Sequence, residues 1–269
     1  MVKIETKQNP SLIESMFQAG AHFGYSKTRR HPSFQQVLFG SKNRIDIIDL
    51  EKTGTYLNTA VEYVKESVKN GKNILFVGTK PEARKIMEEV VVPAEVPYVM
   101  ERWVGGTLTN LSEMRKRIAR LEELQGKKER GELDVYTKKE RLLFDRETED
   151  LLRKFGGVVT LKQLPSIVCV IDPKHEETAV QEALRKKIPV IALAGSDCDI
   201  SNIAYPIPAN DSSLLSIRFF LNKIMEAYTE GLRAREIKVE TPNAPDVPNP
   251  NDLNKKFDKV NLDNSNTPK

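Results

Sequence analysis

The chain has 269 residues, of which 39% are hydrophobic and 30% are charged, a composition typical of a soluble protein with a large polar surface. It contains no run of about twenty apolar residues and begins without an apolar secretory core, so we expect neither a membrane span nor export. Two cysteines and three histidines are too few and too scattered for a zinc site or a disulfide framework, so we expect no metal and no cofactor. The net charge of +4 favours an anionic partner without requiring one.

The first predicted element is a short helix that Asn9, Pro10 and Ser11 can cap and that Gly20 ends. Residues 21–32 then have the character of a loop, in which aromatic side chains and histidines alternate with basic ones. Such interleaving suits neutralisation of RNA phosphates together with stacking on bases or riboses. Two alternatives stay open, a solvated basic loop and a metal-binding histidine pair, for which no third ligand is evident. The candidate RNA contacts here are Lys27, Arg29 and Arg30.

A second basic pair, Lys42 and Arg44, stands directly before an apolar strand and is also expected to contact RNA. Strands and amphipathic helices alternate from there to residue 100, and Pro81 occupies the favourable first position of one of the helices. The predicted elements are a strand over residues 45–50, a helix over 57–68, a strand over 73–77, a helix over 81–92 and a strand over 96–100.

Residues 102–110 hold the only tryptophan of the chain, Trp103, between Arg102 and the glycine pair Gly105 and Gly106. The glycines supply backbone freedom, the arginine supplies a fork of donors and the indole supplies a stacking face. One interpretation is a hinge with a buried tryptophan, and the other is a nucleic-acid contact where an arm leaves the globular body. We favour the core role for Trp103, which leaves Arg102 to face the RNA.

Residues 111–155 are predicted to form an antiparallel helical hairpin outside the sheet. Their apolar side chains recur at three and four residues in a narrow seam, and Thr137 with Glu140 has the capping-box pattern of a returning helix. Two helices with one thin stripe each can cover one another but cannot build a wide core. The basic residues that crowd the other faces, and that we expect to contact RNA, are Arg115, Lys116 and Arg117.

Strands and helices resume after the arm, which implies a mostly parallel sheet covered on both faces. Two prolines restrict residues 205–208 to an edge strand, and Asp211 is expected to cap the last helix. The predicted domains are an α/β domain made of residues 1–110 and 156–235, a helical hairpin over 111–155 and a disordered tail over 236–269. The tail is rich in Pro, Asn, Asp and Lys and poor in apolar residues.

The carboxyl ends of parallel strands are the usual place for a ligand, and here they carry Lys80, Asp172, Asp197 and Asp199. A lysine with clustered aspartates could bind Mg²⁺ and a phosphoryl group. No phosphate-binding or dinucleotide-binding glycine motif accompanies them, however, and aspartate is also a common turn residue. We therefore expect Asp172, Asp197 and Asp199 to be turns or caps and the chain not to be an enzyme.

An ordered series of segments resembles the bacterial-type family of ribosomal protein S-two from the small subunit. The most specific segment is Arg102-Trp103-Val104-Gly105-Gly106-Thr107-Leu108-Thr109-Asn110. The resemblance runs from Ser11 to about Ala234. The other matching segments are Ala21-His22-Phe23-Gly24, Ile47-Ile48-Asp49-Leu50-Glu51-Lys52-Thr53, Ile74-Leu75-Phe76-Val77-Gly78-Thr79-Lys80, Thr137-Lys138-Lys139-Glu140, Val170-Ile171-Asp172 and Ile188-Pro189-Val190.

The resemblance implies an α/β fold, namely a flavodoxin-like, three-layer parallel sheet with an inserted antiparallel helical hairpin, and no catalytic role. It also implies a structural constituent of the small ribosomal subunit, a ribonucleoprotein component that binds small-subunit rRNA and neighbouring ribosomal proteins and supports translation. The large ribosomal protein S-one is a further partner in many members of the family. We expect a single copy bound to the ribosome in the cytoplasm, although a plastid ribosome would accommodate the same pattern.

Three loops depart from the family pattern. Tyr25 stands where members usually carry a second histidine, and residues 194–200 lack a usual proline. Ala209 and Ser212 interrupt a third loop motif of the family. All three changes fall at strand ends, so they affect the contacts made there and not the resemblance itself.

Overall fold

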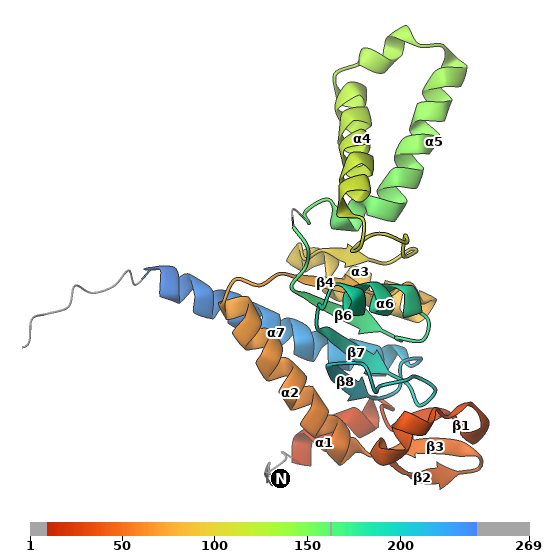
Figure 1. Ribbon diagram of the computed structural model, residues 1–269, viewed down its shortest axis with the longest axis vertical. Coiled ribbons are helices and arrows are strands. Elements are labelled where there is room, and N and C mark those ends of the chain that lie inside the picture. The colour runs from red at the N-terminus through yellow and green to blue at the C-terminus, as the bar shows by residue number, and fades with distance from the viewer. Residues whose placement is uncertain (1–9, 162, 241–269) are drawn as a thin grey trace, which may run out of the picture.

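The computed structural model describes residues 10–161 and 163–240 (Figure 1). These residues form a five-stranded parallel sheet and a three-stranded antiparallel sheet. In chain order the helices and strands are α1 (Pro10–Gln18), β1 (Phe23–Ser26), β2 (Leu38–Lys42), β3 (Ile45–Ile48), α2 (Leu50–Lys69), β4 (Ile74–Val77), α3 (Pro81–Val90), β5 (Tyr98–Val99), α4 (Leu111–Glu129), α5 (Lys138–Phe155), β6 (Ile167–Ile171), α6 (Glu177–Arg185), β7 (Val190–Ala194), β8 (Tyr205–Pro208) and α7 (Leu214–Glu240). The 3-10 turns are η1 (Lys27–Arg29), η2 (Pro32–Val37), η3 (Val92–Ala94), η4 (Glu132–Val135) and η5 (Gly156–Val158).

The parallel sheet has the strand order β5-β4-β6-β7-β8 and is covered on both faces. Alternate side chains of β4 enter two different cores: Ile74 and Phe76 join the core with α2, α3 and α7, and Leu75 and Val77 join the core with α6. All four residues of β4 are buried, as the apolar run predicted. The proline-containing strand β8 lies at the edge of the sheet, which confirms the prediction for residues 205–208.

Helices α3 and α5 begin at the residues where the sequence predicted a helix start. Pro81 is at the first turn of α3, and the side chain of Asp49 accepts the N–H groups of Glu51 and Lys52 at the start of α2. Thr137 and Glu140 form the predicted capping box of α5.

Within residues 10–161 and 163–240, none of the helices has the length and apolar character needed to span a membrane.

The three-stranded sheet, with the order β1-β3-β2, was not predicted in full. The segment over residues 21–32 was expected to be a loop, but Phe23–Ser26 pairs with β3 as a strand. Both pairings of β3 contain a register shift, and most of the side chains of β1 and β2 are partly or fully exposed. Such short, irregular strands carry little of the period-two apolar pattern from which strands are recognised.

The arm, residues 111–155, comprises α4, η4 and α5, and it projects away from the parallel sheet (Figure 1). The two helices contact each other along the seam read from the sequence. This seam belongs to the same continuous core as the α6 face of the sheet. Its buried members are Met114, Ile118, Leu121, Leu124, Leu151 and Phe155.

The start of α7 differs from the prediction, in which Asp211 capped the helix. The side chain of Asn210 accepts the N–H groups of Ser212 and Ser213 before the helix begins at Leu214, whereas the Asp211 side chain is 1% exposed and turned toward the sheet. The helix continues to Glu240 and so includes the first residues of the predicted tail segment 236–269. Residues 241–269 lie outside the described residues.

Candidate nucleic-acid interface

The three-stranded sheet brings basic side chains from two separate segments together. The backbone N–H of Lys27 donates a hydrogen bond of 2.9 Å to the carbonyl of Arg44. The turn between β2 and β3 holds Asn43 and Arg44 at φ values of 51° and 63°, so Lys42 comes directly before a tight reversal of the chain and Arg44 lies within it. All four basic side chains are exposed. We call them the basic hairpin cluster: Lys27, Arg29, Lys42 and Arg44.

Arg30 has different surroundings from the other predicted RNA contacts. Its guanidinium donates two hydrogen bonds to the carboxylate of Asp46, one of them 2.8 Å long from Nε, and the Asp46 side chain is 0% exposed. A buried carboxylate requires such a partner. Asp46 was not singled out from the sequence, although it shares the inward face of β3 with Ile48, which was a usable signal. Arg30, whose side chain is 19% exposed, is therefore the ion-pair partner of a buried carboxylate.

The hinge loop, residues 103–109, closes around the carboxylate of Glu182. Oε1 of Glu182 accepts from the indole N–H of Trp103 at 3.1 Å and from the backbone N–H of Gly106 at 2.7 Å. Oε2 accepts from the backbone N–H groups of Leu108 and Thr109 and from the Thr109 hydroxyl, each at 3.0 Å. Both carboxylate oxygens are thus satisfied inside the protein.

Burial acts to raise the pKa of Glu182, but the hydrogen bonds from Gly106, Trp103 and the backbone beyond them outweigh it, so the pKa is lowered. The sequence reading missed this residue. The sequence pattern that could have indicated Glu182 is an acidic residue on the inward face of α6, close in sequence to the buried Ala179 and Ala183. An ionised group on a core-facing helix position needs donors, and here the glycine-rich segment supplies them.

Trp103 is 8% exposed and lies in the core on the α6 side of the sheet. Gly106 adopts φ +95°, a conformation that favours glycine, and its N–H donates to Glu182. Gly105 and Arg102 are exposed. The segment thus presents Arg102 to solvent while its tryptophan packs inside.

The basic residues of α4 lie on the exposed sides of the helix, between the buried positions Met114 and Ile118. Lys116 forms a 2.6 Å ion pair with Glu113, and both side chains are more than half exposed. Arg117 lines a groove of about 240 Å³ with residues of the hinge loop. Arg115 is also exposed. These side chains therefore form a basic face where the arm joins the body.

The two histidines of the first loop have separate partners. The ring of His22 stacks on Phe17 at 4.4 Å and tilts against Phe23 at 4.0 Å, and burial lowers its pKa. His31 Nδ1 instead contacts the hydroxyl of Ser33 at 2.7 Å. The structure does not bring the pair together as joint ligands.

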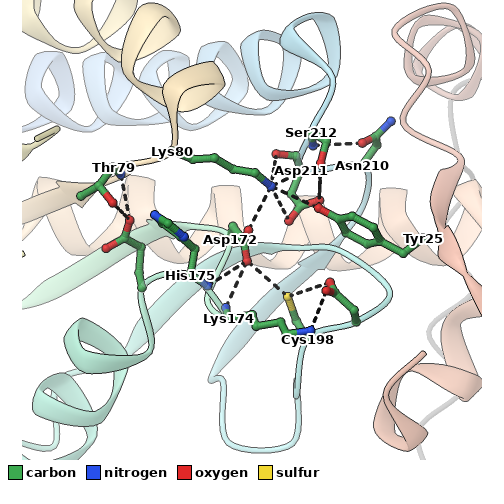
Figure 2. A network of polar contacts seen from close by, with 12 residues as sticks. Tyr25, Thr79, Lys80, Asp172, Lys174, His175, Cys198, Asn210, Asp211 and Ser212 are labelled. Carbon is green, nitrogen blue, oxygen red and sulfur yellow. Dashed lines mark hydrogen bonds and ion pairs between the residues drawn. The ribbon is translucent and has the colours of Figure 1, made fainter. Parts of the chain in front are cut away.

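The carboxyl ends of the parallel strands are occupied by the ammonium group of Lys80 (Figure 2). Lys80 Nζ lies 3.0 Å from Asp172 Oδ2 and 3.5 Å from Asp211 Oδ2. It also donates to the hydroxyl groups of Tyr25 and Ser212, each at 3.2 Å. A charged network of the chain itself therefore surrounds Lys80 at these strand ends, and a hollow of about 280 Å³ lies beside it, lined by residues that include Lys174, Asp197 and Asp199.

The charged groups around Lys80 shift one another's pKa values. Burial would lower the pKa of Lys80, but Asp211 and Asp172 raise it. Burial and the charge of Asp172 raise the pKa of Asp211 to about 6, against the opposing effect of Lys80. Burial raises the pKa of Asp172 as well, but Lys80 and backbone hydrogen bonds outweigh it and lower that pKa. The two buried carboxylates thus share one cation unequally.

Asp172, Cys198 and Asp211 are close enough to be considered as metal ligands, with ligand atoms within 4.8 Å of one another. Lys80 already contacts both carboxylates, so a metal ion would have to displace a bound ammonium group. Burial and the neighbouring aspartates also raise the pKa of the Cys198 thiol, which keeps it protonated and a poor ligand. This chemistry favours an internal ion-pair network over a metal centre.

The three strand-end aspartates singled out in the sequence make turn and ion-pair contacts. Asp172 Oδ1 accepts the N–H groups of Lys174 and His175, Asp199 accepts the N–H of Ser201, and Asp197 pairs with Lys174 at 2.8 Å. Asp172 also adopts φ 60°, which aspartate tolerates better than most residues. Their turn roles agree with the sequence prediction.

The fold and these surfaces define a basic α/β protein with a charged helical arm, whose strand ends carry internal ion pairs. The family model of "Ribosomal protein S2" matches residues 16–231. The chain belongs to this family.

Individual relatives agree with that assignment, and each is named "Small ribosomal subunit protein uS2". The relative from Roseiflexus sp. is 42% identical over 224 residues, which is 83% of this chain and 86% of the relative. The relative from Mycolicibacterium vanbaalenii is 40% identical over 83% of this chain and 82% of its own length. The relative from Geotalea uraniireducens is 38% identical over 85% of this chain and 90% of its own length.

Proposed function

We propose that the chain is a structural constituent of the small ribosomal subunit, where it binds small-subunit rRNA and neighbouring ribosomal proteins and so supports translation. The family match over residues 16–231 carries this role, since the relatives are named as small-subunit proteins. The net charge of +4 is compatible with binding to the phosphate backbone of RNA.

We infer that rRNA contacts two surfaces. The first is the basic hairpin cluster, whose two segments meet through the Lys27–Arg44 backbone hydrogen bond. The second is the base of the arm, where Arg102 and the basic residues of α4 are exposed. Basic side chains of this kind bind phosphates, position the protein and carry little base identity. Arg30 supports the first surface indirectly, because it neutralises Asp46 beneath it.

The test of this assignment is a salt series on complexes with purified small-subunit rRNA. Changing all four residues of the basic hairpin cluster to Ala should reduce the slope of log K against log salt by about 3, at roughly 0.7–0.9 per phosphate contact. A control with the same loss of charge changes four exposed residues elsewhere to Ala, namely Lys69, Lys85, Arg185 and Lys186. If the control loses as much slope as the cluster variant, binding follows net charge and the assigned surface is wrong.

We further infer that the sheet is flavodoxin-like and that residues 111–155 are an antiparallel helical hairpin inserted into one domain made of residues 1–110 and 156–235. The order β5-β4-β6-β7-β8 supports this, since in parallel-strand numbering it is 2-1-3-4-5. The strands before the arm pair directly with those after it, as β4 does with β6. Replacing residues 111–155 by a short glycine linker should leave a cooperatively folding domain, and loss of cooperative unfolding would argue against the inference.

We also propose that the chain has no catalytic role, acts as a single copy and works on ribosomes of the cytoplasm, with a plastid ribosome as the alternative setting. Membership of a ribosomal protein family supports the first point. Ribosomal protein S-one is a further candidate partner. Sedimentation of the free chain and of reconstituted small subunits, with and without S-one, would test the copy number and that partnership together.

A further inference from the structure

The carboxylate of Glu182 connects the body of the protein to the outgoing end of the arm. Glu182 is on α6, which packs on the sheet, and all of its hydrogen-bond donors are in the hinge loop. It is 5% exposed. The contact therefore joins α6 to the segment that leads from β5 into α4.

Backbone hydrogen bonds connect the hinge loop directly to the first turn of α4. The backbone N–H of Asn110 donates to the carbonyl of Gly106 at 2.7 Å, and that of Met114 donates to the carbonyl of Asn110 at 3.3 Å. Gly106 is itself held by Glu182 at 2.7 Å. A continuous series of hydrogen bonds thus runs from α6 through the loop into the first turn of α4.

The returning end of the arm is fixed differently. A Cβ atom at Gly157 would lie 2.3 Å from the carbonyl oxygen of Tyr98, so the chain passes β5 at very close range. Phe155 and Val158 are buried beside it. Close packing fixes the return, whereas the exit has, besides the buried Trp103 and Leu108, a charged acceptor and its donors. Two separate attachments define an orientation better than one does.

We propose that Glu182 is a positioning residue for RNA binding: its hydrogen bonds to the hinge loop hold Arg102 and the basic face of α4 in one orientation relative to the sheet. The consequence for RNA rests on the proposed function, whereas the orientation of the arm does not. A fixed arm lets the basic hairpin cluster and the arm bind one RNA surface together at a smaller ordering cost than a mobile arm would.

The test uses the full chain with Glu182→Gln, which keeps the size of the side chain but turns an amide NH2 group toward part of the ring of donors. Glu177→Gln is the matched control, since Glu177 is an exposed acid on the same helix. Spin labels on cysteines placed at the exposed positions Lys69 and Glu129 report the distance from body to arm. The native Cys169 and Cys198 are buried.

In RNA-free protein we expect the Lys69–Glu129 distance distribution to broaden in Glu182→Gln and not in Glu177→Gln. Amide exchange at Gly106, Leu108 and Thr109 should accelerate at least tenfold, on the order expected when a local segment opens without global unfolding. Should Glu182→Gln fail to fold, Thr109→Val removes a single hydroxyl donor and should broaden the distribution to a smaller extent.

Binding to purified small-subunit rRNA supplies the readout that a merely structural role would not change. We expect Glu182→Gln to weaken binding about tenfold, and less than twofold when Arg115, Lys116 and Arg117 are already Ala, since both changes act through the arm. An unchanged distance distribution would overturn the proposal, as would a broadened one with additive effects on binding. Failure of the wild-type chain to bind rRNA would instead overturn the proposed function, and the distance measurement would still decide the orientation.

Discussion

The indole N–H of Trp103 donates a 3.1 Å hydrogen bond to the buried carboxylate of Glu182, 79 residues away in the sequence. A buried tryptophan N–H needs an acceptor and a buried carboxylate needs donors, so each residue meets the requirement of the other. This pair explains why the most distinctive segment of the chain lies against α6.

Trp103 should therefore contribute to stability through both its ring and its N–H group. Trp103→Ala is expected to lower the free energy of unfolding by about 3–5 kcal/mol, as is usual when a large aromatic side chain is removed from a core. Trp103→Phe keeps most of the apolar surface but removes one donor from Glu182, so its cost should be smaller, about 1–3 kcal/mol. Chemical denaturation of both variants checks the order. A cost near zero for Trp103→Phe would show that the hydrogen bond contributes nothing measurable.

Glycines 105 and 157 offer a matched pair at the two ends of the arm. A Cβ at Gly157 would lie 2.3 Å from the carbonyl oxygen of Tyr98, whereas a Cβ at Gly105 would meet nothing within 4 Å. Gly157→Ala should destabilise by about 1–3 kcal/mol or more, because backbone must move to relieve the overlap. Gly105→Ala should stay within about 0.5 kcal/mol of wild type. Thermal melts that showed the reverse order would contradict this account of the arm's attachment.

Arg29 and Arg30 are adjacent, but replacing them should change different properties: RNA binding for Arg29 and stability for Arg30. Arg30→Ala leaves the buried carboxylate of Asp46 without its guanidinium partner, and losing one side of a buried ion pair typically costs about 3–5 kcal/mol. Arg29→Ala removes an exposed side chain, so stability should change by less than about 0.5 kcal/mol while the rRNA salt slope falls by about 0.7–0.9. Denaturation and salt titration of both variants separate the roles. A stable Arg30→Ala protein with a reduced slope would return Arg30 to the RNA-facing set.

The Lys80 network should give stability a recognisable pH dependence. Because the pKa of Asp211 is raised to about 6, the folded state holds a proton there that the unfolded state, with a pKa near 3.9, has released. Stability from this group is present below about pH 4 and is lost as the pH rises through 6. Asp211→Asn removes that loss, so its stability relative to wild type should rise by roughly 3 kcal/mol between pH 4 and pH 7. Parallel pH-dependent denaturation curves for the two proteins would show that Asp211 does not titrate in this window.

The same network should exclude divalent metal binding. Lys80 already supplies a positive charge to Asp172 and Asp211, so calorimetry with Mg²⁺ should reveal no site tighter than roughly millimolar, far weaker than dedicated carboxylate sites. Tight binding that disappeared in Asp172→Asn would favour a metal centre at the strand ends and reopen the phosphoryl-transfer alternative.

The sequence by itself determined the features that depend on neighbouring residues. Apolar runs such as Ile74–Val77 predicted buried parallel strands, and Pro81, Thr137 and Glu140 predicted where helices begin, because helix termini are set by local backbone hydrogen bonds. Residues 102–110 also carry a resemblance to the family to which the chain belongs.

Only the tertiary structure decided which polar residues meet. Asp211 was expected to cap a helix on local grounds, but the fold places it against Lys80, 131 residues away, where burial raises its pKa. In the sequence Arg30 likewise resembles its basic neighbours, but in the fold it pairs with Asp46 of β3. Glu182 carried no motif of its own. The free energy of a buried charge depends on the donors that surround it, and those donors come from distant segments that the folded chain alone brings together.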